Sequence, residues 1–450
     1  MSDGADSLLS RREQLTDLVE HVLAQAKAKG ATAAEVSAGL STGLSVTVRM
    51  GEVETLEHHR DRGLGITVYF GQRKGNASTS DFAPASIQES VEAACSIARH
   101  TEPDPAAGLA DADRMAVDPP ELDLYHPWDL SAEQAVELAR DSERAALEVD
   151  SRITNSEGAS VHAGAGLSVY GNSHGFVGVK QGTRHSIGCS VIASDGQGMQ
   201  RDHWYSVARH ADALDTPEAV GQLAGSRAVR RLGCRPIRTG QFRVLYAPEV
   251  ARGLIGHFVS AVSGGSLYRR ASFLLDQKGQ PVFPAGFRID EQPHLHGALG
   301  SAAFDGEGVA TAPRDLISDG VLQGYVLDSY SARRLNMETT GNAGGVHNLV
   351  VEPGTQDQTS LLQSMGTGLW VTELMGQGIN MVTGDYSRGA AGYWVENGEV
   401  VHPVEEITVA GNLRDMFRQI LAVGNDVDLR GNIRCGSLLV DGLTIASGTQ

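Results

Sequence analysis

Residues 393–401 read Tyr-Trp-Val-Glu-Asn-Gly-Glu-Val-Val, so the dipeptide Asn397-Gly398 stands between two short apolar runs. Asn-Gly is a strong sequence signal for a two-residue β-hairpin, because both residues tolerate the positive φ angles of a type I′ turn. Asp319-Gly320, also flanked by apolar pairs, gives the same signal. The two predicted hairpins indicate that antiparallel strands dominate the second half of the chain.

Outward from these hairpins, the first half of the chain mixes helices with strands. Apolar residues recur at every second position in residues 44–50 and 64–70, which predicts strands with one buried face. Residues 153–192 also read as strands, separated by glycines. Helices are predicted within residues 1–30, 84–99, 131–149 and 216–232, and in the second half near residues 248–263 and 358–366.

A boundary between two domains is predicted near residue 235, where Arg235-Pro236 precedes a new strand that starts at Gly240. The predicted class is α+β. Residues 1–235 are expected to form an N-terminal α/β domain, and residues 236–450 a mostly antiparallel β domain with few helices. Residues 101–128, rich in Pro, Asp and Ala, are predicted to be a long surface connection.

The composition excludes several classes of partner. The chain carries 37 basic and 55 acidic residues, a formal net charge of −18. A nucleic-acid partner is not expected, because proteins that bind the phosphate backbone present a basic face. An anionic membrane surface is disfavoured for the same reason. Glycine is in excess, at 54 of 450 residues, about 12% against roughly 7% in average proteins.

Cysteine usage and hydropathy predict a cytoplasmic protein. The four cysteines, Cys95, Cys189, Cys234 and Cys435, form no CxxC pair, and so few cysteines in a long chain suit a reducing compartment. Residues 1–30 lack the apolar core of a signal peptide. We find no apolar stretch that approaches the length of a membrane span.

Nucleotide chemistry is not expected. None of the five lysines follows a glycine, so the chain has no phosphate-binding P-loop, and GxGxxG is missing as well. Residues 171–175, Gly-Asn-Ser-His-Gly, fit the G-x-S-x-G pattern of a hydrolase nucleophile. That motif requires a helix after the serine, whereas the following residues read as a strand. A hairpin turn is therefore the favoured interpretation.

The sequence offers no complete metal site. A helical H-E-x-x-H motif is absent. His294 and His296 would share one side of a strand and would supply two ligands, but the neighbouring residues are typical of a loop.

Glycine-rich blocks of the second half carry a family resemblance. They are Gly264-Gly-Ser-Leu-Tyr-Arg-Arg, Phe304-Asp-Gly-Glu-Gly, Ser329-Tyr-Ser-Ala-Arg, Thr340-Gly-Asn-Ala-Gly-Gly, Thr372-Glu-Leu-Met-Gly-Gln-Gly, Gly384-Asp-Tyr-Ser-Arg-Gly-Ala-Ala-Gly and Val423-Gly-Asn-Asp. Further blocks in the first half include Gly63-Leu-Gly-Ile-Thr-Val-Tyr and Thr154-Asn-Ser-Glu-Gly. Nearly the whole chain resembles the TldD/PmbA family of peptidase proteins, and more closely its PmbA (TldE) branch.

The resemblance implies a cytoplasmic heterodimer in which TldD and PmbA subunits together degrade unfolded peptides or mature peptide precursors. It also implies that the C-terminal domain is equivalent to the metallopeptidase domain of TldD, where an HExxxH motif and a distant cysteine hold zinc. Those positions fall on Ala247, Pro248 and Arg252 here, and Cys435 matches the cysteine. Alanine has no donor atom, arginine repels a cation, and proline cannot act as a base. We therefore expect no zinc in this chain and zinc in the TldD partner.

Two sets of residues are candidates for contact with substrate or partner. Arg252 has the chemistry to donate to a peptide carbonyl or carboxylate. Asp385, Tyr386 and Arg388 place an acid, a phenol and a guanidinium between glycines, a composition that fits a peptide groove and equally fits a subunit contact.

Two other functions remain open on the sequence. One is an active homodimeric metallopeptidase that uses an unrecognised site, with Cys435, His294 and His296 as the candidate residues. The other is a non-enzymatic peptide-binding protein. A homodimer of the isolated chain is also compatible with the sequence.

Overall fold

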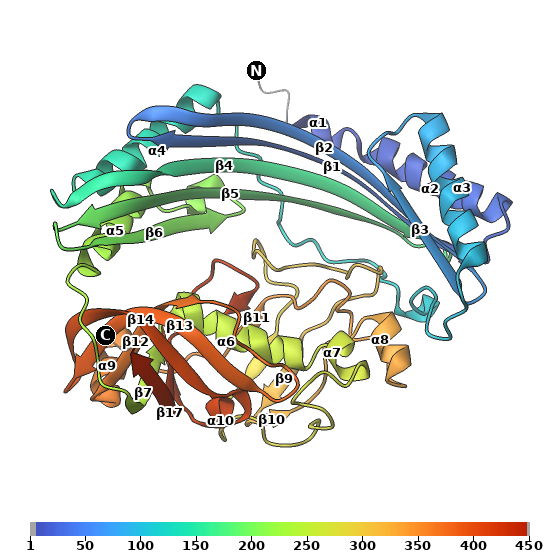
Figure 1. The fold of residues 1–450 in the computed structure, drawn as a ribbon. Coiled ribbons are helices and arrows are strands. Elements are labelled where there is room, and N and C mark those ends of the chain that lie inside the picture. The colour runs from blue at the N-terminus through green and yellow to red at the C-terminus, as the bar shows by residue number, and fades with distance from the viewer. Residues whose placement is uncertain (1–5, 448–450) are drawn as a thin grey trace.

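The computed structural model describes residues 6–447 (Figure 1), in which a long curved sheet arches over a second, β-rich half of the chain. The six strands of the long sheet are antiparallel throughout, in the order β3-β2-β1-β4-β5-β6. They are β1 (Ala33–Arg49), β2 (Glu52–Phe70), β3 (Arg73–Thr79), β4 (Ile153–Asn172), β5 (Val177–Ser194) and β6 (Met199–Ala208).

These strands are much longer than the alternating segments that predicted them. Apolar residues at alternate positions of β1, such as Val36, Ala38, Val46 and Val48, are buried near its two ends. In the middle of the strand, residues 39–43 include two glycines, and Leu40 is their only apolar side chain beyond glycine. The sequence therefore indicated the ends of this strand more clearly than its centre.

Two helix pairs cover one face of this sheet at its opposite ends (Figure 1). Helices α2 (Arg12–Ala28) and α3 (Pro84–His100) pack on one end, and α4 (Ala132–Leu147) and α5 (Pro217–Arg230) on the other. The predicted caps are confirmed, because Ser131 forms a capping box with Gln134 and Thr216 accepts a hydrogen bond from the amide of Ala219. The short α1 (Asp6–Leu9) precedes them.

The second half contains two sheets. The larger has the order β14-β13-β12-β7-β17-β15 and the smaller β10-β9-β8-β11-β16; each contains one parallel pair, β12–β7 and β11–β16. The strands are β7 (Gly240–Tyr246), β8 (Ile289–Glu291), β9 (Arg314–Ser318), β10 (Val321–Leu322), β11 (Leu349–Val351), β12 (Gly368–Met375), β13 (Asp385–Glu396), β14 (Glu399–Asn412), β15 (Ile420–Val423), β16 (Ile433–Arg434) and β17 (Leu438–Ser447).

Both predicted hairpins are confirmed. Asn397 and Gly398 have φ angles of 52° and 80° between β13 and β14, and Asp319 and Gly320 have 49° and 76° between β9 and β10. The helices of this half are α6 (Pro248–Ala261), α7 (Gly264–Tyr268), α8 (Ser329–Arg334), α9 (Gln358–Met365) and α10 (Leu413–Arg418). The prediction of an α+β fold is confirmed.

Residues 171–175 form the turn between β4 and β5, and a strand follows them. The hairpin interpretation of the G-x-S-x-G pattern is thus confirmed. Ser173 donates its backbone amide to the carbonyl of Ala34 and accepts the amide of Ala34 on its hydroxyl. The serine side chain is therefore used to tie the turn to β1.

The prediction of a surface connection at residues 101–128 is wrong in one respect, because this segment is partly buried between the halves. Ala106, Leu109 and Leu122 are buried. Arg333 of α8 donates to the backbone carbonyls of Ala106, Gly108 and Leu109. The apolar residues of this segment follow neither the helical nor the strand period, so its burial left no sequence signal.

We propose residue 235 as the domain boundary, because α5 ends at Arg230 and β7 begins at Gly240. Among residues 6–447, we find no helix with the length and apolar character needed to cross a bilayer.

Replacing Gly221 by alanine is expected to lower the free energy of unfolding by about 2–3 kcal/mol. A Cβ at this position of α5 would lie 2.0 Å from the backbone oxygen of Ser142, so α4 and α5 would have to separate. Gly253→Ala in α6 is the matched control, because its Cβ would enter open space and alanine favours the helix by about 0.5–1 kcal/mol. Urea unfolding of both variants checks this, and equal losses would contradict the close packing of α4 on α5.

Candidate functional site

The candidate site begins where β7 turns into α6. Ala247 is the N-cap residue of α6 and Pro248 occupies its first turn, where the fixed φ of proline suits a helix start. The backbone amide of Ala247 donates to the carbonyl of Val371 at 2.9 Å, and the residue is only 2% exposed. The first two positions of the metal motif implied by the family resemblance thus hold backbone contacts and no ligand atom.

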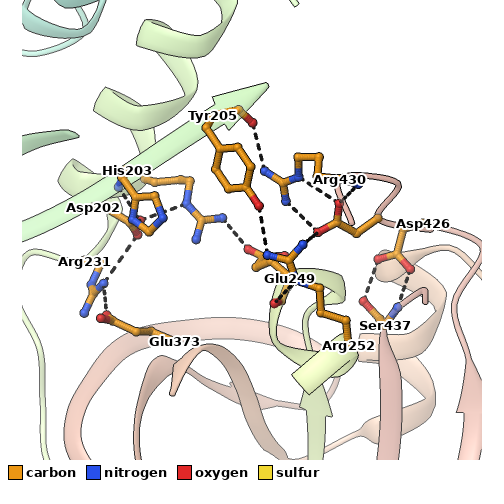
Figure 2. Close-up of polar contacts among 12 residues, drawn as sticks. Asp202, His203, Tyr205, Arg231, Glu249, Arg252, Glu373, Asp426, Arg430 and Ser437 are labelled. Atoms are coloured by element: carbon orange, nitrogen blue, oxygen red, sulfur yellow. Dashed lines mark hydrogen bonds and ion pairs between the residues drawn. The ribbon is translucent and has the colours of Figure 1, made fainter. Parts of the chain in front are cut away.

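Arg252, at the third motif position, extends from α6 to where the second half of the chain meets the long sheet (Figure 2). Its Nη2 donates to the phenol oxygen of Tyr205 in β6 at 3.0 Å. Its Nη1 lies 3.5 Å from Oδ2 of Asp428. A guanidinium therefore fills the place of the second histidine, and its charge opposes binding of a cation there.

Asp428 is the carboxylate at the centre of this contact, with its side chain only 3% exposed. Arg430 holds it in a fork, with Nε to Oδ1 at 2.9 Å and Nη2 to Oδ2 at 3.0 Å. Burial alone would raise the pKa of Asp428, but the hydrogen bonds and charge of Arg430, together with the charge of Arg252, bring that pKa below its ordinary value. The carboxylate is therefore ionised at neutral pH.

Arg430 also contacts the long sheet. Its guanidinium carbon lies 4.0 Å from the ring centroid of Trp204 and 4.6 Å from that of Tyr205. Its Nη1 donates to the backbone oxygen of Tyr205 at 3.2 Å. Cation–π contacts of this kind are stronger when the cation is partly desolvated, so Arg430 joins the second half of the chain to β6.

A second group of ion pairs extends this junction along α5 (Figure 2). Arg227 pairs with Glu249 at 2.8 Å and with Asp202 at 3.2 Å. Arg231 pairs with Glu373 at 2.5 Å and with Asp202 at 3.6 Å. The acids around the start of α6 are thus each engaged by an arginine, which leaves them poorly suited to act as metal ligands or as a general base.

Cys435, the match to the family cysteine, is fully buried. Its thiol donates to the backbone oxygen of Gly436 at 3.1 Å, and its own backbone oxygen accepts the amide of Asp428 at 3.0 Å. Burial, with the nearby charges of Asp426 and Asp428, raises the pKa of this thiol far above the ordinary range. A catalytic zinc needs three protein ligands, so this cysteine alone cannot form the site.

The residues around α6 therefore do not fit a zinc ion. Among residues 6–447, no three His, Cys, Asp or Glu side chains are grouped in a way that could hold a metal. His294 lies within 3.0 Å of the hydroxyl of Thr311, and burial lowers its pKa. His296 is exposed. Within the part of the chain that the structure describes, neither histidine joins Cys435 in a metal-binding group.

The three groove candidates do not share one surface. Successive residues of a strand face opposite sides, and Tyr386 is in the core at 2% exposure whereas Asp385 is exposed. Asp385 accepts from the hydroxyl of Thr383 at 2.6 Å. Arg388 is half-buried and donates to the backbone oxygen of Met375 at 3.4 Å. Contact with substrate or partner stays a prediction for Asp385, Arg388 and Arg252, while Tyr386 packs inside this chain.

The ion pairs around Asp428 could not be predicted from the sequence. Arg430 follows Asp428 by two residues, a spacing too common to carry meaning. The remaining partners come from β6, α5 and α6, far apart in the sequence. Only the block Val423-Gly-Asn-Asp, just before them, drew attention to this segment.

Three family models match the chain in order, and all three describe PmbA/TldA metallopeptidases. They cover residues 34–98 with domain 1, residues 125–232 with the central domain and residues 239–447 with the C-terminal domain. The chain belongs to the PmbA/TldD metallopeptidase family. The resemblance drawn from the glycine-rich blocks is confirmed.

Full-length relatives place the chain in the PmbA branch of this family. Metalloprotease PmbA of Escherichia coli O157:H7 is 49% identical over 437 residues, which are 97% of each chain. A PmbA homologue from Haemophilus influenzae is 47% identical over 446 residues, or 99% of each chain. Both identities extend over both halves of the protein.

Solved structures show the same fold. A protein from Bacteroides thetaiotaomicron, described as a candidate modulator of DNA gyrase, has a TM-score of 0.93 at 28% identity and covers 97% of this chain and 100% of its own. TldE from Thermococcus kodakarensis has a TM-score of 0.81 at 20% identity and covers 96% of this chain and 100% of its own. The second likeness concerns the fold alone.

Replacing Asp428 by asparagine is expected to cost about 3 kcal/mol of stability at pH 7, because Arg430 loses its buried partner. The native pKa of Asp428 lies below the unfolded value of about 3.9, so its contribution is complete above that pH. It is lost as the pH falls through the native pKa. The stability difference between wild type and variant should therefore shrink below about pH 4.

Urea unfolding at a series of pH values measures this difference. Asp113→Asn, at an exposed carboxylate in the 3-10 turn Ala112–Arg114, is the control and should behave like the wild type. A difference that stayed constant down to low pH would show that Asp428 acts by shape and not by charge.

Proposed function

We propose that this chain is the PmbA/TldE-type subunit of a TldD–PmbA metallopeptidase complex that degrades unfolded peptides and trims peptide precursors. In this proposal the chain has no zinc site of its own, and the zinc lies in the TldD-type partner. The observation that carries the proposal is the ion pair of Arg252 with Asp428 at the start of α6. It places a bound cationic side chain where the family's second histidine ligand would stand.

The chemistry of the donor set supports this assignment. A catalytic zinc site needs three protein ligands and an open position for water. Of the matching positions here, Ala247 and Pro248 have no donor side chain, and Arg252 is a cation. The thiol of Cys435 is buried and resists ionisation. The relatives named metalloproteases thus share a fold with this chain, while its own α6 lacks the means to activate water.

Under this proposal the chain contributes binding surface and stability to the complex. Its four cysteines are free, which agrees with the proposed cytoplasmic setting. The acidic net charge of −18 disfavours a nucleic-acid partner. In isolation the chain is proposed to form a homodimer, which light scattering would test.

The purified chain alone is expected to contain no stoichiometric zinc and to leave unfolded peptides intact. Mixed with the TldD-type subunit from the same organism, it should co-purify as a complex that cleaves the same peptides and is inhibited by a chelator. Elemental analysis and a peptide-cleavage assay on each sample measure this.

The outcomes separate the three functions. Stoichiometric zinc together with cleavage by the chain alone would establish the active homodimer and overturn the proposal. Peptide binding without any association with a TldD-type subunit would establish a non-enzymatic peptide-binding protein instead.

Cys435→Ala is expected to leave the peptidase activity of the complex unchanged, because the thiol is packed in the core and donates to the backbone of Gly436. Cys189→Ala is the matched control, since this second buried thiol lies in β5, away from α6. Each variant should lose about 1 kcal/mol of stability. Loss of activity confined to Cys435→Ala would instead favour a site on this chain that uses this cysteine.

A further inference from the structure

The centre of the long sheet carries few side chains on the face opposite the helix pairs. The strand registers align its residues in three rows that run from β2 through β1 and β4 to β5. We call their central glycines and serines the glycine floor. The rows are Gly63, Gly39, Ser168, Lys180; then Asp61, Ser41, Gly166, Gly182; then His59, Gly43, Gly164, Arg184.

Part of this floor is open space that a side chain would fill. Within the described residues, a Cβ at Gly63 would have no neighbour inside 4 Å, and one at Gly166 would meet only the backbone oxygen of Leu40 at 3.8 Å. Both glycines lie inside extended strands, where any residue fits the backbone. Glycine at such a position allows another molecule to approach the sheet closely.

The floor faces a cavity of about 1060 Å³ that lies between the two halves of the chain. Residues 119–124 of the connecting segment and residues 301–304 of the second half form its other walls. Lys180 reaches across to the second half, where its Nζ donates to the backbone oxygen of Asp305 at 2.9 Å. The volume corresponds to that of sites that bind drug-sized ligands.

Three cations gather on the β5 side of this cavity. Lys180 and Arg184 project from β5, and Arg209, just after β6, fills the space above Gly182. Arg209 donates to three backbone oxygens, those of Ala298, Thr183 and Leu299, at 3.0, 3.1 and 2.8 Å. These partners are neutral and use three of its five N–H donors, so the charge and two donors remain for an anion.

None of the ion pairs within residues 6–447 includes Lys180, Arg184 or Arg209. Burial and the charge of Arg184 lower the pKa of Arg209. Burial also lowers the pKa of Lys180, against the opposing charge of Asp305. Lys180 thus has a carboxylate nearby and Arg184 is exposed, whereas Arg209 is partly buried without a counter-ion. A buried charge without a partner is costly, so an anion bound beside Arg209 would be stabilising.

The acids that line the cavity are Asp61, Glu121 and Asp123. Asp61 stands on β2, three strand spacings from β5, or roughly 14 Å. Asp123 precedes Leu124, whose backbone oxygen accepts the amide of Thr183 in β5, and its carboxylate lies 3.1 Å from Nε2 of His126. Glu121 is exposed on the connecting segment. Within the described residues, none of these acids forms an ion pair with the three cations, which leaves the cations available to an anion.

We propose that this cavity is a binding subsite for the carboxylate of an extended peptide, held by Lys180, Arg184 and Arg209 with the peptide backbone over the glycine floor. The peptide rests on the function proposed above, and the subsite deepens that function. A free C-terminus and an acidic side chain offer the same carboxylate. A polyanion is not the ligand, because the net charge of −18 repels it, whereas a single carboxylate on a neutral backbone matches the local charge.

Calorimetric titration of the full chain with three short peptides tests this subsite. The probes are N-acetyl-tetraalanine with a free carboxylate, the same peptide as its C-terminal amide, and the amide of N-acetyl-Ala-Ala-Asp-Ala. The free acid should bind about tenfold or more tightly than the tetraalanine amide, since charge-assisted hydrogen bonds are lost in the amide.

The third probe identifies the source of the carboxylate. Binding equal to that of the free acid would show that a side-chain carboxylate also enters the subsite. Binding equal to that of the tetraalanine amide would assign the subsite to a peptide C-terminus. Equal binding of all three peptides, or no binding of the free acid, would overturn the proposal.

Three variants locate the subsite. Lys180→Gln and Arg184→Gln should each lower the affinity for the free acid about tenfold. The affinity for the tetraalanine amide should not change. Gly166→Leu should abolish binding of both by filling the floor, and thermal unfolding confirms that the variant is folded. Arg201→Gln, at an exposed arginine of β6, is the control and should bind like the wild type. Unchanged affinity in both charge variants would contradict the assignment.

Different results would contradict the subsite and the proposed function. A complex that cleaves peptides with no preference for free acids would remove the subsite and leave the function standing. Preferential binding of the free acid by a chain that never associates with a TldD-type subunit would keep the subsite and remove the proposed function.

Discussion

The junction of the two halves depends on one buried carboxylate, that of Asp428. Arg430 holds it by a two-point contact while stacking on Trp204 and Tyr205 of the long sheet, and Arg252 approaches it from α6. A buried charge is tolerated only when it is paired, so these residues have to keep their positions together. The same contacts occupy the helix on which the family resemblance implies metal ligands in TldD.

The sequence predicted most local structure of the fold because local rules govern it. The Asn397-Gly398 and Asp319-Gly320 turns require only their own φ angles, and the capping box of Ser131 lies within four residues. The full length of the strands was not predicted, because the centre of the long sheet is rich in glycine, which is typical of turns as well as of strands. Burial of residues 101–128 was missed because it depends on α8, more than two hundred residues later.

For the candidate site, the sequence could predict only which positions lack a metal-binding side chain. Ala247 and Pro248 cannot supply a side-chain metal ligand, whatever surrounds them. What stands in place of the metal was not predictable, since Arg252 meets Tyr205 and Asp428 from distant elements. Tyr386 was predicted to line a groove from the composition of its segment, whereas its position on β13 places its side chain in the core at 2% exposure.

The hydrogen bonds from Arg333 to the backbone of residues 101–128 have a consequence for synthesis of the protein. The backbone oxygens of Ala106, Gly108 and Leu109 emerge from the ribosome long before α8 exists. Domains fold largely as they are made, so the long sheet can form while this segment still lacks its anchor. The segment can attach only after the second half has been made, so its attachment is a late step of folding. On unfolding, the same contact is expected to be among the first to break between the two halves.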